Sequence, residues 1–499
     1  MKGFLSALFS PAGLFLLVLL AARLTFIQQI GLELSPDEAY YWDWSRHLAW
    51  GYYSKPPMVA WIIHFFTKNL GNTEYAVRVP AALLGTLYLA FIYYLGQHLF
   101  DRRVGLWAAL AAAATPLASI YSFVMTIDPP LLFFWSLALC VGWQAAQNRR
   151  LIDFLFLGVV IACGLLTKQT MLAFLVVYLL WLYVDRVNYS WFKEWKIYCM
   201  LVVILVLISP NIVWNIKNNW IMFKHTHEHF QGQGFFLLGP FLFLFEQAGV
   251  ITPIIFFLML FVFYTFIRSP KLKRNRPLSY LFCMSALPLI MVFPLSFLRK
   301  VNANWPYPFY SSAYVLLSAL VLYGKWPKNT ALFWRRLFYL GVCLGMFIAF
   351  LIYQIPRTPN IFPLSLQKLL YKFSGWKDLA NFVQKNRDPY EIIIASRRQY
   401  ASELSFYLPD HPRVYTYWTG RVRSQYDIWD DLLSQRGKNV LLVLKKKKEI
   451  QKLKTCFEDL FLVGRWEKYL FGKKRKVWLY RGQRLRLCPY LGPESSEGK

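Results

Sequence analysis

The sequence contains little charge, and acidic residues are especially scarce. Only 16% of its 499 residues are Asp, Glu, Lys or Arg, whereas 57% are apolar and 19% are aromatic. With a mean hydropathy of +0.35, this composition excludes an ordinary soluble protein and predicts a polytopic membrane protein. The net charge of +30 does not indicate nucleic-acid binding, because basic residues in such chains usually lie in loops on one side of the membrane or face anionic lipid.

Several common motifs are also missing. The chain has no glycine-rich phosphate loop, Walker motif or dinucleotide fingerprint, so we expect it not to use nucleotide energy directly. The N-terminal apolar stretch lacks a small-residue cleavage site and is predicted to remain as the first span. Five of the seven cysteines lie in apolar runs, while Cys456 and Cys488 could pair if their region is exported.

Long apolar runs recur along the first 353 residues. A helix needs about 20 apolar residues to cross a bilayer. Such runs lie at about 10–30, 79–100, 104–125, 130–147, 153–184, 198–214, 239–267, 279–297, 309–323 and 333–353. The run 153–184 is too long for one helix, and we expect a tight turn at Thr167–Thr170 to divide it. The pattern predicts a polytopic α-helical region of about eleven spans.

Lysine and arginine are concentrated in alternate loops. One set of short loops holds 17 of these residues, and the opposite set, mostly of longer loops, holds nine. Because cytoplasmic loops carry the basic excess, the first set is predicted to be cytoplasmic. The first long loop, residues 31–78, then faces outward, together with the short loops at Asp128 and Lys168 and the chain after residue 353.

Residues 354–499, here called the tail, have a different pattern. Segments typical of strands lie at 391–396, 439–445 and 476–482, and amphipathic helical segments lie at 376–386 and 425–435. This alternation predicts a small soluble α/β domain on the outer side. The basic run Lys445–Lys448 is more typical of a solvated face near anionic headgroups than of a nucleic-acid site.

The first loop begins with two adjacent acids, Asp37 and Glu38, followed by a dense aromatic group that includes Tyr41. Aromatic side chains beside a carboxylate suit sugar binding, and partial burial makes a carboxylate more basic. An aromatic belt at the membrane interface explains the same tryptophans. At the other end of the loop, Lys55 precedes two prolines; it could pair with a lipid phosphate or simply extend to the interface.

Two further charged residues lie in outward turns. Asp128 begins the next span, where it could merely cap a helix, and Lys168 lies in the tight turn at 167–170. Two acids and two lysines on one outer surface together indicate an acid/base site for a phosphate-bearing substrate.

His225, His227 and His229 have a spacing that resembles a metal site. Alternating histidines meet one ion only if the segment is extended, and the sequence offers no evident fourth ligand. We therefore predict no metal site and interpret this segment as a polar loop over the site.

The order and side of these fragments resemble the bacterial relatives of the dolichyl-phosphate-mannose protein mannosyltransferases. That group, glycosyltransferase families 39 and 83, includes the aminoarabinose transferases of lipid A. The matching fragments are Asp37-Glu38, Tyr41, Lys55-Pro-Pro57, Arg78-Val-Pro80, Asp128, Thr167-Lys168, Asn302-Ala-Asn-Trp-Pro306, Arg398–Tyr400, Glu403–Tyr407 and Gln425–Trp429.

The resemblance implies a GT-C fold and an inverting, metal-independent transfer from a polyprenyl-phosphate sugar, without a cofactor. It implies that Asp37 deprotonates the acceptor hydroxyl and that Lys55 holds the lipid phosphate. Asp128 is expected to be a second acid of the site, and Lys168 to assist the leaving phosphate.

Two further residues complete the set of candidates. Tyr41 is assigned to the donor phosphate group, and Glu38 is a catalytic candidate without a defined step. One position departs from the family pattern, since the aminoarabinose transferases typically carry Glu where this chain has Ser54. That departure argues against transfer of their particular sugar.

We therefore predict an envelope glycosyltransferase in the bacterial inner membrane, with its active site facing the periplasm. Its acceptor would be lipid A, core oligosaccharide, another glycan or a protein. The alternative is a transporter or flippase for a lipid-linked sugar, which would favour charged or broken helices near the midplane and repeated halves.

Overall fold

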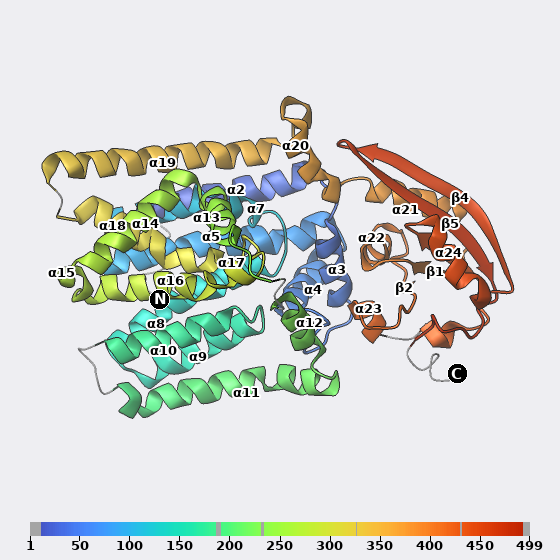
Figure 1. The fold of residues 1–499 in the computed structure, drawn as a ribbon, viewed down its shortest axis with the longest axis horizontal. Coiled ribbons are helices and arrows are strands. Elements are labelled where there is room, and N and C mark those ends of the chain that lie inside the picture. The colour runs from blue at the N-terminus through green and yellow to red at the C-terminus, as the bar shows by residue number, and fades with distance from the viewer. Residues whose placement is uncertain (1–10, 186–190, 231–233, 326, 430–431, 493–499) are drawn as a thin grey trace.

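The computed structural model describes residues 11–185, 191–230, 234–325, 327–429 and 432–492. Within these ranges the chain forms a long bundle of helices and, at one end of it, a smaller part built on a β-sheet (Figure 1). The first-loop helices α3 (Pro36–Ser45) and α4 (Met58–Leu70) lie between the two parts (Figure 1).

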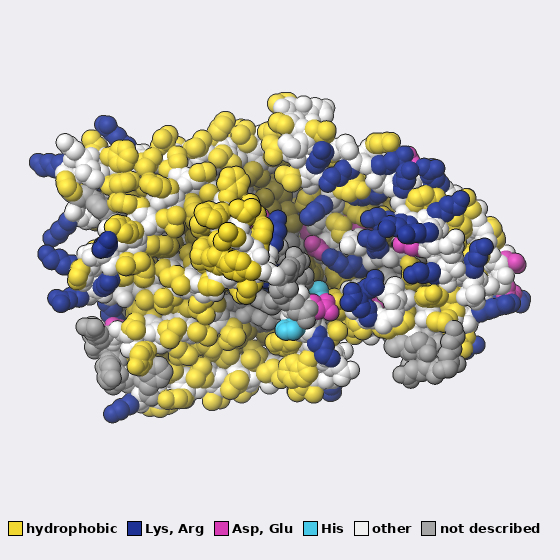
Figure 2. All heavy atoms as spheres, in the orientation of Figure 1, with side chains coloured by type: hydrophobic (Ala, Val, Ile, Leu, Met, Phe, Trp, Pro, Cys, Tyr) yellow, Lys and Arg dark blue, Asp and Glu magenta, His cyan; other side chains and the backbone are white. Residues whose placement is uncertain are grey.

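The helical bundle consists of apolar helices of unequal length. Among the described residues, six are long and apolar enough to cross a membrane: α2 (Pro11–Gln29), α5 (Glu74–Leu99), α8 (Asp128–Asn148), α11 (Trp195–Lys217), the α16–α17 stretch (Arg276–Leu298) and α19 (Lys328–Gln354). The shorter apolar helices are α9 (Leu151–Leu165), α10 (Met171–Val184) and the pair η3 (Tyr307–Phe309) and α18 (Tyr310–Tyr323). A wide apolar surface covers the outside of this bundle (Figure 2), as lipid-facing helices require. The expectation of a polytopic helical membrane protein is confirmed.

Two of the expected spans are not single helices. The run 104–125 forms α6 (Arg102–Ala113) and the short α7 (Pro116–Ile120). The run 239–267 forms α13 (Gly239–Ile251) and α14 (Pro253–Arg268), which are bent by 114°. A proline begins the second helix of each pair; it has no N–H to donate and disfavours helical backbone in the residue before it. At the sharper break, Thr252 has a φ of +76°.

The break expected at Thr167–Thr170 is confirmed. Helix α9 ends at Leu165 and α10 begins at Met171. In the turn between them, the backbone N–H groups of Thr167 and Lys168 both donate to Gly164 O, at 3.0 and 2.9 Å.

The start of α3 follows from a local pattern, Ser35-Pro36-Asp37-Glu38. The Ser35 N–H donates to Glu38 Oε2 (2.9 Å), and the Glu38 N–H donates to Ser35 Oγ (3.4 Å), which is a capping box. The aromatic residues that follow point inward, and Trp42 and Trp44 are fully buried. Their interpretation as an interfacial belt is therefore wrong.

The tail contains a five-stranded sheet with strand order β2-β1-β3-β5-β4. The first three strands in this order, β2 (Val414–Thr416), β1 (Ile392–Ala395) and β3 (Val440–Leu444), are parallel. Strands β4 (Asp459–Leu470) and β5 (Lys473–Gln483) form an antiparallel hairpin that pairs with β3 through β5. Helices α21 (Trp376–Asn386) and α22 (Arg398–Tyr407) lie between this sheet and the first loop (Figure 1).

The strand expectations for 391–396, 439–445 and 476–482 are confirmed by β1, β3 and β5, and the helix expected at 376–386 is α21. The expected helix 425–435 is only two short turns, α23 (Gln425–Ile428) and η6 (Leu432–Gln435), and residues 430–431 lie outside the described residues. Strands β2 and β4 and helix α22 were not expected. Cys456 and Cys488 form a disulfide.

The remaining elements are short or peripheral. They are η2 (Trp191–Lys193), α12 (Ile221–Phe230), α15 (Pro270–Lys273), η4 (Pro359–Ile361), α20 (Leu364–Gln367), η5 (Lys368–Phe373), η7 (Lys447–Glu449), α24 (Ile450–Leu453) and η8 (Lys454–Cys456). One continuous core joins the first loop to the tail, since buried residues of α3, such as Trp44, cluster with Leu379 of α21 and Leu441 of β3. This shared core holds the tail against the first loop.

Candidate active site

Glu38 is fully buried and has a partner for each of its oxygens. The Arg78 guanidinium donates through Nε to Oε1 (2.9 Å) and through Nη2 to Oε2 (3.0 Å). Oε1 also accepts from the Met125 N–H (3.1 Å), and Arg78 donates further to the carbonyls of Leu32 and Glu33. We call this cluster, Ser35, Glu38 and Arg78 with the backbone of Met125, the Glu38 junction. It ties α3, α5 and the loop before α8 together, a geometry that favours a structural role for Glu38 over a catalytic one.

Asp37, the neighbouring residue, has the opposite surroundings. Its side chain is 54% exposed, and its Oδ1 accepts from Arg398 Nη2 at 2.9 Å. The Arg398 guanidinium lies over the Tyr40 ring, 4.7 Å from its centroid. Oδ2 of Asp37 has no hydrogen-bond partner among the described residues, so the carboxylate is held by one oxygen and presents the other.

Asp128 and Lys168 form a largely buried ion pair at the end of the bundle that faces the tail. Lys168 Nζ lies 2.8 Å from Asp128 Oδ1, and both side chains are about nine-tenths buried. Asp128 Oδ2 accepts from Asn304 Nδ2 (3.3 Å), which comes from the loop before η3. Asp128 is the first residue of α8 but does not cap it through its side chain, so the simple capping interpretation is wrong.

Lys55 is the unpaired cation of the group. Within the described part of the chain its ammonium has no ion-pair or hydrogen-bond partner. Burial, the largest cause, and the nearby charge of Lys168 together lower the pKa of Lys55 to about 8, although Asp128 and Asp37 oppose the shift. An anion bound here would supply the missing partner.

Tyr41 lies close to two of these charged groups, Asp37 and Asp128. It is buried, and its ring is 5.0 Å from that of Trp44. Burial and then the charges of Asp37 and Asp128 raise the pKa of the Tyr41 hydroxyl well above its ordinary value. The hydroxyl therefore stays a hydrogen-bond donor at any physiological pH.

These contacts bring Asp37, Tyr41, Lys55, Asp128 and Lys168 within electrostatic reach of one another, although they come from three different loops. Glu38 lies behind this group, within the core. The predicted roles of all six residues stay predictions.

The histidine segment is helical rather than extended. His225 and His227 lie on α12, where residues two positions apart point to different sides; the side chain of His229 lies outside the described residues. In the described ranges no group of three His, Cys, Asp or Glu side chains could hold a metal ion.

Two residues of this site were not foreseen as members of it. Arg398 and Asn304 lie in fragments that carried the family resemblance, but their contacts with Asp37 and Asp128 span 361 and 176 residues of sequence. A local signal was available for Glu38: Ser35-x-x-Glu38 is the pattern of a capping box.

The tail also packs against the first loop. Gln425 donates from its backbone N–H to the Tyr40 hydroxyl (2.5 Å) and accepts at Oε1 from the Tyr53 N–H (2.7 Å). Tyr426 donates to Asp43 Oδ2 at 2.6 Å. The site is thus bounded by the helical bundle on one side and by the tail on the other.

Known proteins resemble this chain in sequence. Residues 54–214 match the family model described as dolichyl-phosphate-mannose-protein mannosyltransferase. The lipid A galacturonosyltransferase RgtD of Rhizobium johnstonii is 30% identical over 304 residues, which are 59% of this chain and 62% of that protein. An undecaprenyl phosphate-alpha-4-amino-4-deoxy-L-arabinose arabinosyl transferase of Sodalis glossinidius is 30% identical over 150 residues, 27% of each chain. The matches thus span less than two thirds of these relatives.

Solved structures extend the likeness to the whole fold. ArnT from Cupriavidus metallidurans bound to undecaprenyl phosphate superposes with a TM-score of 0.67 at 17% identity, over 94% of this chain and 98% of that one. The archaeal oligosaccharyltransferase AglB from Archaeoglobus fulgidus gives a TM-score of 0.53 at 12% identity, over 88% and 70%. The resemblance to the mannosyltransferase and aminoarabinose transferase group is therefore confirmed, by sequence over residues 54–214 and by the GT-C fold over nearly the whole chain.

Proposed function

We propose that this protein is an inverting glycosyltransferase. It moves a sugar from a polyprenyl phosphate to an envelope glycolipid at the outer face of the bacterial inner membrane. The observation that carries the proposal is Lys55, a sheltered ammonium without an anionic partner in the described ranges, within electrostatic reach of a half-exposed carboxylate, Asp37. A phosphate would form an ion pair with the Lys55 ammonium, and an acceptor hydroxyl would donate a hydrogen bond to the Asp37 carboxylate. The relatives named above support the same chemistry.

In the proposed reaction the acceptor oxygen bonds to the anomeric carbon as the bond from that carbon to the phosphate oxygen breaks. The proton of the acceptor hydroxyl passes to Asp37, whose Oδ1 is fixed by Arg398. The electron pair of the broken bond leaves with the polyprenyl phosphate, whose charge is balanced by Lys55 and Lys168. Asp128 holds Lys168 in place, Tyr41 donates a hydrogen bond to the donor phosphate, and Glu38 keeps the loop in shape.

The membrane arrangement follows from the same proposal. Six long helices, the bent pair α13–α14, three shorter apolar helices and α6 with α7 make eleven passes. Lysines and arginines gather at the end of the bundle farthest from the tail (Figure 2), and this end is assigned to the cytoplasm. Residues 1–353 are assigned to the membrane domain and residues 354–499 to a periplasmic domain. The oxidising periplasm allows the Cys456–Cys488 disulfide to persist.

We infer that the transferred sugar is itself anionic. The buried Arg398 Nη1 has no partner in the described part of the chain, and Ser54 stands where the aminoarabinose transferases typically carry an acid for their cationic sugar. A uronic acid such as the galacturonosyl group of the relative's name fits this charge. In an assay that offers polyprenyl phosphates carrying galacturonic acid, aminoarabinose or mannose, the first should turn over fastest. Preference for aminoarabinose would contradict the inference.

The proposal is tested with Asp37→Asn in purified protein reconstituted with donor and lipid A. Loss of the base should lower turnover by about a hundredfold to ten-thousandfold, while the protein stays folded. Asp410→Asn is the matched control, because Asp410 is also half-exposed and paired with an arginine, Arg387. Asp410 follows the C-terminal end of α22, whereas Arg398 begins that helix. Full turnover by Asp37→Asn would reject this role of Asp37. Lipid movement without release of polyprenyl phosphate would favour a flippase.

A further inference from the structure

The tail contains a large cleft at one edge of its sheet. The cleft has a volume of about 710 Å³ and lies where the parallel strands end: Ser396 follows β1, Thr416 ends β2 and Lys446 follows β3. The chain leaves β1 toward β2 on one side and later returns to β3 on the other side. In open α/β sheets, ligands bind outside the carboxyl ends of strands at such a change of direction.

The lining of this tail cleft is strongly basic. It includes six cations, Arg397, Arg398, Arg423, Lys446, Lys448 and Lys452. Only Arg398 forms an ion pair within the described part of the chain, with Asp37. On the face of the tail seen in Figure 2, lysine and arginine side chains are also numerous.

The two acids of the lining are already engaged. Asp427 Oδ2 accepts from the N–H groups of Arg423 and Ser424 and from the Ser424 hydroxyl. Glu449 Oε2 accepts from the Lys446 N–H. Both carboxylates therefore hold turns of the backbone, and the unpaired cations are left to face the cleft.

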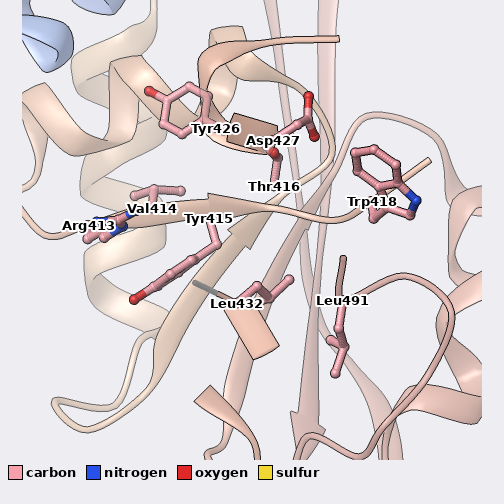
Figure 3. Close-up of a pocket in the computed structure, with 9 residues that line it drawn as sticks. All are labelled: Arg413, Val414, Tyr415, Thr416, Trp418, Tyr426, Asp427, Leu432 and Leu491. Carbon is pink, nitrogen blue, oxygen red and sulfur yellow. The ribbon is translucent and has the colours of Figure 1, made fainter. Parts of the chain in front are cut away.

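Further polar groups at the cleft lack partners. The buried atoms Arg398 Nη1 and Thr416 Oγ1 have no hydrogen-bond partner among the described residues. Helix α22 begins at the cleft without a side-chain cap, so its first N–H groups are available to an anion. Figure 3 shows Thr416 and Asp427 beside each other at the end of β2. Buried polar atoms without partners are rare in folded proteins and suggest an absent ligand.

The cleft adjoins the active site through Arg398, which lines it and also binds Asp37. A second cavity of about 350 Å³ shares Arg397 and Gln399 with the cleft and includes Pro36, the residue before Asp37. A saccharide bound in the cleft can therefore place one of its hydroxyl groups near the Asp37 carboxylate.

We propose that the tail cleft binds the phosphorylated saccharide headgroup of the acceptor glycolipid. Clustered cations and helix N-terminal N–H groups suit phosphate, and the position beside Asp37 suits the molecule that is deprotonated there. This inference rests on the proposed function for the identity of the acceptor, but binding to the cleft can be measured without any transfer.

The experiment uses full-length protein in neutral lipid nanodiscs and a soluble probe, the deacylated bisphosphorylated disaccharide of lipid A. The triple variant Arg423→Ala, Lys448→Ala, Lys452→Ala removes three cleft cations that touch neither Asp37 nor the donor site. The control variant Lys385→Ala, Arg436→Ala, Lys438→Ala removes the same number and kind of charges from exposed tail positions outside the cleft.

We expect the triple variant to weaken probe binding by about tenfold or more, since charge-assisted hydrogen bonds to phosphate are lost. The dephosphorylated disaccharide should bind weakly to the wild type and to the triple variant. In transfer assays the KM for the acceptor should rise while the KM for the donor stays unchanged. The control variant should match the wild type.

The outcomes separate the two proposals. If the wild type transfers sugar but the triple variant has an unchanged acceptor KM and probe affinity, the cleft proposal is overturned and the proposed function stands. If the wild type binds the probe through the cleft but transfers nothing, the proposed function fails instead. If the wild type binds vesicles containing phosphatidylglycerol through these cations but not the soluble probe, the cleft is a membrane-docking surface and the proposal is wrong.

Discussion

The Glu38 junction and the tail cleft both contain several charged groups, but they use them in opposite ways. At the junction every charged atom of Glu38 and Arg78 has a partner, and neither side chain is accessible. At the cleft five of six cations have no ion pair among the described residues. Satisfied charge organises the structure, whereas unsatisfied charge in a cleft is available to a ligand. Asp37 and Arg398 lie between these extremes.

The largest effect is expected from breaking the junction. Glu38→Gln leaves Arg78 as an uncompensated buried cation, which should lower the free energy of unfolding by about 3–5 kcal/mol. Thermal unfolding in detergent should show a clear drop in Tm. Asp37→Asn, one residue away, removes an exposed pair that contributes about 1 kcal/mol or less, and its Tm should stay close to the wild type. A Glu38→Gln protein with normal Tm but no activity would instead support the catalytic role first predicted for Glu38.

A smaller effect is expected from Arg398, which belongs to both the active site and the cleft. Arg398→Lys keeps the charge but loses the planar group that contacts Asp37 and covers Tyr40. Turnover should fall by about tenfold to a hundredfold through lost positioning of the base, with little change in Tm. Arg387→Lys provides the control, because Arg387 is likewise paired with a half-exposed carboxylate, that of Asp410, but lies outside the cleft. Equal losses in both variants would contradict a specific role for Arg398.

The pH dependence of donor binding provides a third test. The Lys55 ammonium has a pKa of about 8, so it loses its charge as the pH rises through 8. A polyprenyl phosphodiester keeps its single negative charge over this range. The KM for the donor should therefore be constant below about pH 7 and rise about fivefold between pH 8 and 9. Lys55→Arg should flatten this profile, since a guanidinium stays charged. A flat wild-type profile would remove Lys55 from the donor site.

The smallest effect is expected from the stability of the cleft variant. Arg423, Lys448 and Lys452 make no ion pairs in the described structure, so their joint replacement by alanine should change the free energy of unfolding by no more than about 0.5 kcal/mol. The Tm of the triple variant should match that of the control variant. A large loss of stability would show that these cations are structural, and the contrast with the Glu38 junction would disappear.

Patterns that repeat along the chain could be predicted from the sequence. Apolar runs predicted most of the helices, and the breaks between them predicted the turn at Lys168 and the position of the polar first loop. Short β-type segments identified β1, β3 and β5. These features follow from local hydrophobicity and backbone preference, which a sequence displays directly.

Contacts across long separations could not be predicted in the same way. The capping-box pattern marks Glu38, but no local signal predicts its burial or the exposure of Asp37, because these depend on Arg78 and Met125 on one side and on Arg398 on the other. The 114° bend at Thr252 was missed because the run through it stays apolar, although Pro253 marks the break. Strand β4 was missed because half of its side chains are exposed and its sequence lacks a clear apolar alternation.

The pairing of Asp37 with Arg398 has a consequence for biosynthesis. The two residues are 361 positions apart, so at about 5–20 residues per second a ribosome needs roughly 20 to 70 s to make the second after the first. In the proposed topology the first loop has by then reached the outer side, but Asp37 is not yet paired with Arg398 and the tail cleft has not yet formed. Under the proposed function, we therefore expect the chain to stay inactive until its tail has folded, so that an unfinished chain does not consume the donor lipid.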